Sequence, residues 1–430
     1  MSARHSRDTV IANVAQQGSA LLLLLAIPNL LSVEHYAEVV FVGVVLSFTR
    51  FSDLGLSLVF GRDAPRHHAL EESEEIELWG RTLFWFGMMG AAVAGCFAAI
   101  VMYLRFGTLA DASIVLILPL LSSVVSTYVS MASVRSDFRA YRNSQVGLSI
   151  SRLLAIPLAL PFGVLGWLAA QIASLVLVIS GIGVRWIPVP PRTDWDLVRR
   201  HLPAALQLAL ISLLWVQLLD SARLLASIYY PPEGIAIYGI LVAGYQSVYS
   251  LVISAYLPVS VRTLGLLGKS DREAAEYVFG VINRTVPAVF VLVIVAAELS
   301  PWLLELVFPK YSIDPLMPKV ILYGLTVLPF AATLGNLFVG KRKTGLYLAM
   351  LTVAFSASAA LEQLLRPEVG IRAAAIAQAT GTAILALLMV VASRSLFAHA
   401  PRTAYAKMRA AVVRLGVLWA VYLILKVGFS

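Results

Sequence analysis

The sequence predicts an all-α, polytopic membrane protein that crosses the bilayer about twelve times. Of its 430 residues, 59% are hydrophobic and only 13% are charged, and its mean hydropathy is +0.83. A soluble domain has about 25% charged residues, so the composition excludes a soluble globular protein. Apolar runs of about 20 residues, the length that spans a bilayer, recur along the whole chain.

Each apolar run predicts one spanning helix, and the runs divide evenly into two groups of six. The predicted spans are 9–31, 36–60, 80–104, 111–133, 145–162, 164–186, 203–229, 235–260, 285–308, 315–340, 344–364 and 371–394. A further run, 415–425, is only 11 residues long before Lys426 interrupts it. This last run predicts an interfacial helix or a short span.

The basic residues predict the orientation, because lysine and arginine collect in cytoplasmic connections. Alternate connections differ about four to one in lysine and arginine, which places the N-terminus in the cytoplasm. The first apolar run is too long for a cleavable signal peptide. The net charge of +9 therefore reflects topology and does not indicate nucleic-acid binding.

The chain is expected to form two lobes, residues 1–187 and 203–395, joined by a cytoplasmic linker at 188–202 that is rich in proline and arginine. A basic tail, 396–430, follows. Because each lobe has six spans, both lobes start on the same side, and a pseudo-two-fold axis along the membrane normal is expected to relate them. The segments Gly163–Gln171 and Gly370–Gln378 share their Gly-to-Gln spacing and support this repeat.

Charged pairs inside the spans are the first candidate functional residues. Arg50 and Asp53 are three residues apart, as are Asp220 and Arg223. On a continuous helix this spacing places both charges on one face. A charge at bilayer depth costs about 2.5–3.5 kcal/mol, so that face is expected to meet protein or water. The pairs either line a central cavity or are nearly neutral ion pairs at helix ends.

Other polar residues in the spans extend the predicted cavity wall. Asn13 and Gln17 lie in the first span and Arg152 in the fifth, where its side chain alternatively snorkels to the headgroups. Glu298 is followed by Pro301, which is expected to kink or end the helix. It is either a charge partner or a residue of the outer boundary. The single cysteine and the absence of histidine from the spans predict no metal site and no cofactor.

Several degenerate motifs occur in a characteristic order. They are Asn13-x-x-x-Gln17-Gly18, Ile27-Pro28-x-Leu30, Asp53-Leu54-Gly55-Leu56, Tyr238-Gly239, Leu306-Val-Phe308-Pro-Lys-Tyr311 and Gly370-Ile371-x-Ala373-Ala374. In these motifs the chain resembles polysaccharide (O-antigen or lipid-linked oligosaccharide) flippases of the multidrug/oligosaccharidyl-lipid/polysaccharide exporter superfamily. The resemblance covers about residues 9–395. Pro309 departs from the glycine found in many relatives.

This resemblance implies a transporter, not an enzyme, in the bacterial cytoplasmic (inner) membrane. It implies that a polyprenyl-diphosphate-linked oligosaccharide is flipped to the outer leaflet by alternating access, for polysaccharide or lipopolysaccharide biosynthesis. Its implied partners are this substrate, membrane lipids, other polysaccharide-assembly proteins and a coupling proton or sodium ion, with no nucleic acid.

The resemblance also suggests roles for the candidate residues. Arginine donates two hydrogen bonds to one phosphate and is always charged. Arg50, Arg152 and Arg223, with Asn13 and Gln17, are therefore the predicted substrate ligands. Asp53, Asp220 and Glu298 are the predicted charge partners or ion-coupling residues.

Two alternatives compete with a lipid-linked sugar flippase. A cation-coupled multidrug exporter of the same superfamily is expected to have an acidic or apolar cavity, and the interior arginines argue against one. A membrane enzyme of polysaccharide assembly needs a catalytic acid, base or nucleophile, usually with an extended outer loop. The connections here are short and, apart from His35, the external ones lack histidine.

Overall fold

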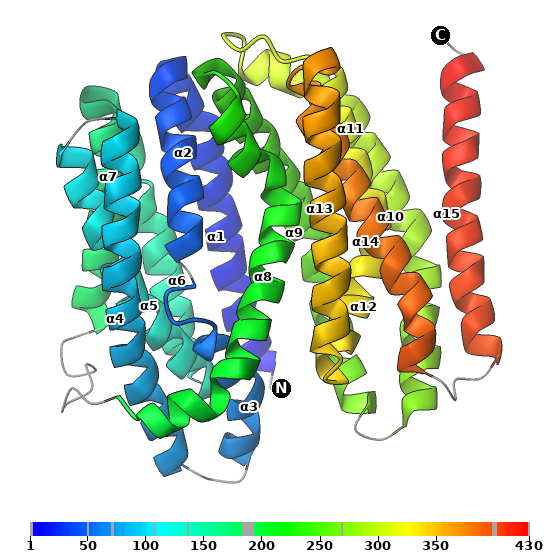
Figure 1. Ribbon diagram of the computed structural model, residues 1–430, viewed down its shortest axis with the longest axis horizontal. Helices are drawn as coiled ribbons and strands as arrows, with labels where there is room; N and C mark the ends of the chain where they lie inside the picture. Colours follow the sequence, from blue (N-terminus) through cyan, green and yellow to red (C-terminus); the bar gives the residue numbers. More distant parts are fainter. Residues whose placement is uncertain are drawn as a thin grey trace. The chain divides into compact units, whose positions relative to one another are not determined.

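The computed structural model is helical throughout, with no strand among the residues that it describes (Figure 1). These residues are 3–49, 51–69, 73–106, 109–135, 137–182, 193–267, 270–397 and 402–428. Within them, 11 helices are long and apolar enough to cross a membrane. The predicted all-α polytopic fold is confirmed.

The chain divides into two compact units, Met1–Leu213 and Leu214–Ser430. Their boundary falls inside one long helix, α8 (Trp195–Tyr229), whose first half belongs to the N-terminal unit. Of the predicted linker 188–202, residues 188–192 lie outside the described part. The axis proposed to relate the two lobes stays a prediction.

The described part of the N-terminal unit contains seven helices in addition to the start of α8. They are α1 (Ala3–Leu30), α2 (Val33–Thr49), α3 (Leu56–Ala69), α4 (Ser73–Phe106), α5 (Leu109–Val134), α6 (Phe138–Arg152) and α7 (Ala155–Ile182). Helix α1 packs mainly on α6, and α4 packs mainly on α5. The single helix predicted over 36–60 is wrong, because residues 51–55 form turns that separate α2 from α3.

The fifth and sixth spans were predicted to meet at residue 163, and the structure has a sharp kink there. Gly163 has φ 56° and ψ −131° within α7. A Cβ on Gly166 would lie 1.9 Å from the carbonyl oxygen of Leu158, so the chain folds back on itself at this point. The fifth span nevertheless begins earlier than predicted, at Phe138, and is interrupted by a turn at 153–154.

The corresponding position of the C-terminal unit has almost the same backbone conformation. Gly370, between α13 (Thr344–Val369) and α14 (Arg372–Leu396), has φ 58° and ψ −135°. Few residues other than glycine adopt a positive φ of this kind, because a Cβ would crowd the backbone. Two glycines with matching dihedral angles at matching places in the sequence support the internal repeat.

The remaining described elements of the C-terminal unit are α9 (Pro232–Leu267), α10 (Asp271–Val307), α11 (Leu316–Tyr323), the 3₁₀ turn η2 (Gly324–Val327), α12 (Leu328–Gly340) and α15 (Arg402–Gly428). Three of them pack on α14, namely α11, η2 and α12. Helix α10 begins earlier than the apolar run, because Ser270 accepts a hydrogen bond from the backbone N–H of Glu273 and caps it. Pro301 does not end α10, which continues to Val307.

The C-terminal run predicted at 415–425 is part of a much longer helix. Helix α15 has 27 residues and lies along α10 (Figure 1). Trp419 contacts the ring of Phe290 edge-on at 5.5 Å, and Arg414 donates to the carbonyl of Asn283. Its segment Arg402–Lys426 is long and apolar enough to span a membrane. The basic residues at its start concealed this length in the sequence.

Candidate functional site

The break in the second span determines what Asp53 does. Leu54 has φ 53° and Gly55 has φ 84°, so the chain leaves the helix between α2 and α3. The Asp53 carboxylate accepts hydrogen bonds from the backbone N–H groups of Gly55 at 3.0 Å and Ser57 at 2.8 Å. Asp53 therefore caps α3.

This cap corrects the prediction that Arg50 and Asp53 share one helical face. That prediction required a continuous helix through residues 50–53, and residues 51–55 are turns. Arg50 itself lies outside the described residues, and so do the side chains of Asp220 and Arg223 on α8. The proposed ligand roles of these three residues, and the charge-partner role of Asp220, stay predictions.

Small residues on both sides hold the turn at 51–55 in place within the N-terminal unit. A Cβ on Gly90 of α4 would lie 1.8 Å from the carbonyl oxygen of Ser52. On the other side, a Cβ on Gly55 would lie 2.4 Å from the carbonyl oxygen of Ala205 on α8. Small residues let backbones approach closely in membrane proteins. The turn is therefore a packed element of the unit.

Helix α1 presents polar side chains on a surface that the N-terminal unit does not cover. Asn13, Gln16 and Gln17 are all exposed. They lie within a helix that is otherwise apolar enough to span the membrane. Polar groups at such a position are expected to face water or protein, because lipid cannot hydrogen-bond to them. This surface is the part of the unit best suited to line a polar cavity.

Helix α6, which ends in Arg152, packs on the opposite face of α1, because Gln17 lies about half a turn around the helix from Asp8. The Arg142 guanidinium pairs with Asp8 of α1 at 2.7 Å, and Asp8 is buried. Alternation of the spans makes α1 and α6 run in the same direction. At about 1.5 Å per residue, Arg152 therefore lies roughly 15 Å beyond the ion pair, near the level of Gly18. Arg152 is half-buried at the end of α6.

The C-terminal unit contains a buried carboxylate that the sequence analysis missed. Glu362 of α13 has no exposed surface, and neither of its carboxylate oxygens has a hydrogen-bond partner at acceptable geometry in the described part of the chain. One turn earlier, Ser358 donates to the carbonyl of Ala377 at 2.8 Å. Gln378, also buried, accepts from Tyr238 at 2.8 Å. These contacts join α9, α13 and α14 around Glu362.

Tyr230, at the turn before α9, is influenced by this carboxylate. Burial, followed by the negative charge of Glu362, raises the pKa of Tyr230 to about 12. The Tyr230 hydroxyl donates to the carbonyl of Gly370 at 3.3 Å. The Arg366 guanidinium, one turn further along α13, interacts electrostatically with Glu362. A buried carboxylate is costly unless such a cation or a proton compensates its charge. The signal in the sequence was a lone glutamate in an apolar run, close enough to the helix end to be overlooked.

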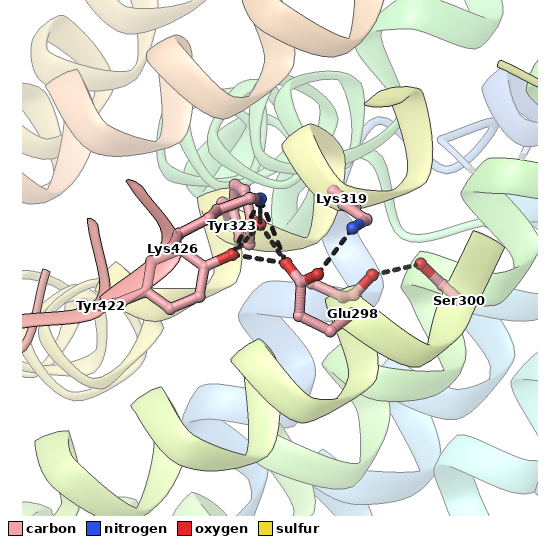
Figure 2. Close-up of polar contacts among 7 residues, drawn as sticks. Glu298, Ser300, Lys319, Tyr323, Tyr422 and Lys426 are labelled. Atoms are coloured by element: carbon pink, nitrogen blue, oxygen red, sulfur yellow. Dashed lines mark hydrogen bonds and ion pairs between the residues drawn. The ribbon is translucent and has the colours of Figure 1, made fainter. Parts of the chain in front are cut away.

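Glu298 of α10, in contrast, is surrounded by donors (Figure 2). Its carboxylate accepts from Lys319 at 2.6 Å and from the Tyr323 hydroxyl at 2.6 Å. The Tyr422 hydroxyl of α15 also donates to it, and the Lys426 ammonium lies 3.5 Å away. The network joins α10, α11 and α15. Its geometry favours a structural tie between these helices, and the predicted ion-coupling role of Glu298 stays untested.

No protein-family model and no curated protein matches this sequence. Solved structures of membrane transporters nevertheless share its fold. A lipid II flippase, MurJ, in an inward closed conformation is 16% identical with a TM-score of 0.61, over 98% of this chain and 93% of that chain. A eukaryotic MATE transporter, AtDTX14, is 14% identical with a TM-score of 0.55, over 96% and 99%.

A third structure comes from a MOP superfamily transporter of Pyrococcus furiosus, whose description states that the reversed polarity of its binding pocket suggests a different function. It is 14% identical, with a TM-score of 0.52 over 96% of this chain and 95% of that chain. At these identities the likeness shows the fold alone. The chain has the fold of the flippase and MATE transporters of the MOP superfamily.

Proposed function

We propose that this protein is a transporter that flips a polyprenyl-diphosphate-linked oligosaccharide from the cytoplasmic to the outer leaflet of the bacterial inner membrane. The product would serve cell-surface polysaccharide or lipopolysaccharide biosynthesis. A fold shared with a lipid II flippase and with MATE transporters supports transport by alternating access over a membrane enzyme.

The partners of two acidic residues in the N-terminal unit support a phosphate-bearing substrate over a cationic drug. The charge of Asp8 is neutralised by Arg142, and both carboxylate oxygens of Asp53 are engaged by backbone N–H groups. Asn13 and Gln17 present exposed amides, and Arg152 ends α6; amide and guanidinium groups donate hydrogen bonds to a diphosphate or a sugar.

A diphosphate must bring its charge across a medium of low dielectric constant, at a Born cost on the order of tens of kcal/mol without compensation. Arginine side chains lower that cost because they stay charged and bind phosphate in a bidentate manner. The lipid tail stays in the bilayer while only the head group crosses.

A cation-coupled exporter of the same superfamily is the second candidate function. One observation favours it, namely the buried carboxylate of Glu362. Under either function, we propose that Glu362 takes up the coupling proton or cation. Contact with other polysaccharide-assembly proteins is also part of the flippase proposal.

The test reconstitutes the full chain in liposomes with a labelled polyprenyl-diphosphate sugar, with and without an ion gradient. Arg152→Ala is expected to slow flipping at least tenfold, whereas Arg139→Ala, an exposed arginine on the same helix, leaves it unchanged. Glu362→Gln is expected to abolish stimulation by the gradient. Flipping by Arg152→Ala at the rate of the unmodified chain would refute the substrate assignment, and export of a cationic dye would favour the second candidate.

A further inference from the structure

The network around Glu298 contains one more positive charge than negative. Lys319 lies 2.6 Å from one carboxylate oxygen and neutralises the group. The Lys426 ammonium lies 3.5 Å from the other oxygen, well beyond the roughly 2.7–2.9 Å of a charge-assisted hydrogen bond. Lys426 is therefore a surplus cation in this network.

The hydrogen-bond donors around Glu298 also indicate that Lys426 is a surplus cation in this network. Tyr323 and Tyr422 have one hydroxyl hydrogen each, and both hydroxyls donate to the same oxygen of Glu298. The Lys426 ammonium donates to the tyrosine oxygens, at 3.1 Å to Tyr422 and 3.4 Å to Tyr323. These are long contacts for a group with three donors. Its side chain is also 45% exposed, so it can bind a further acceptor.

The position of Lys426 along α15 places this surplus charge near a membrane boundary. From Arg402 to Lys426 the helix rises about 36 Å, at 1.5 Å per residue. The hydrocarbon core is only about 30 Å thick. The two basic ends of α15 are therefore expected to lie at the level of the lipid headgroups, where phosphates are found.

The surface beside Lys426 is apolar and uncovered. On α10, Leu299 and Trp302 are exposed, the latter by 61%. On α15, Val421 and Leu425 are exposed. Tryptophan is enriched at the membrane interface, where an apolar surface meets polar headgroups. Two neighbouring helices thus offer an apolar surface that ends in an ammonium group.

We propose that this end of α10 and α15 binds an anionic phospholipid, with its phosphate on the Lys426 ammonium and its acyl chains along the exposed side chains of both helices. The Glu298 network holds Lys426 in place by tying α15 to α10 and α11 (Figure 2). The lipid is a resident of the protein surface and not the transported substrate, so the inference does not depend on the proposed function.

The experiment titrates the full-length protein in detergent with dioleoyl-phosphatidylglycerol and counts bound lipids by native mass spectrometry. A surface lysine contributes about 1 kcal/mol to anionic lipid binding, so Lys426→Gln is expected to bind about fivefold more weakly. Lys426→Arg keeps the charge and is expected to bind as the unmodified chain does. Lys310→Gln, at a lysine over the Tyr311 ring outside the network, is the matched control.

Two further measurements distinguish phospholipid binding from binding of free phosphate and from an effect of misfolding. Inorganic phosphate and dioleoyl-phosphatidylcholine are expected to compete poorly with phosphatidylglycerol. In vesicles, brominated phosphatidylglycerol is expected to quench tryptophan fluorescence with a saturable component that Trp302→Phe loses. Binding by Lys426→Gln within twofold of the unmodified chain, full competition by either competitor, or saturable quenching that survives Trp302→Phe would each overturn the proposal.

Discussion

Asp53 offers the sharpest test of how the structure changes the interpretation of a charged residue. If its carboxylate acts as the cap of α3, an uncharged side chain that still accepts hydrogen bonds should preserve transport. If it instead acts by charge, as an ion site or as a partner of Arg50, removal of the charge alone should stop transport. Asp53→Asn and Asp53→Ala distinguish these roles.

The expected magnitude follows from the two hydrogen bonds at 3.0 and 2.8 Å. Loss of both in Asp53→Ala is expected to cost about 1–2 kcal/mol, the range of strong N-caps. For a unit of this size that lowers the melting temperature by about 2–8 °C. Asparagine keeps one good acceptor, so Asp53→Asn is expected to lose about half as much.

The assay measures thermal unfolding and the flipping rate of the same preparations. Asp137→Ala removes the cap of α6, where Asp137 accepts from the N–H of Ala140 at 3.0 Å, and is the matched control. Asp53→Asn is expected to retain most of the flipping rate at temperatures where it is folded. An Asp53→Asn protein that melts normally but does not transport would refute the capping interpretation.

Two other predictions concern the backbone and the α15 tie. Alanine at Gly163 or Gly370 is expected to lower the free energy of unfolding by about 1–3 kcal/mol, because both positions need a positive φ. Gly18→Ala, with open space around it, is expected to be neutral or stabilising. Equal melting temperatures for all three variants would contradict this reasoning. Glu298→Ala leaves two lysines without their carboxylate and is expected to cost about 1–2 kcal/mol, whereas Glu305→Ala, at an exposed glutamate two turns further on, costs little. An unchanged melting temperature for Glu298→Ala would show that α15 is held by its apolar contacts alone.

Most of the fold could be predicted from the sequence because the bilayer imposes a simple rule. A span must hide its backbone within one helix and must be apolar for about 20 residues, and both requirements are local. The turn at Gly163 was predicted for the same reason, since a glycine separates two apolar runs. The break at 51–55 was not, because Ser52, Asp53 and Gly55 are turn-forming residues that lie inside an apolar run long enough to be taken for one span.

Tertiary packing accounts for that break. The left-handed conformation of Leu54 is unfavourable by itself, and the close approach of Gly90 on one side and Ala205 on the other holds it in place. The role of Asp53 followed from the break. An i, i+3 spacing places two charges together only where the helix is continuous.

The partners of the buried and half-buried charges also depend on tertiary structure and not on local sequence. Glu298 was named from the sequence, but its partners Lys319 and Lys426 lie 21 and 128 residues further along the chain. Glu362 was not named, because its burial depends on α9 and α14. The sequence by itself determined that this is a multi-spanning helical membrane protein, since hydropathy and glycine punctuation are local properties. Only the tertiary structure decided which charges are capped, paired or left alone, because the free energy of a charge depends on the atoms that surround it in space.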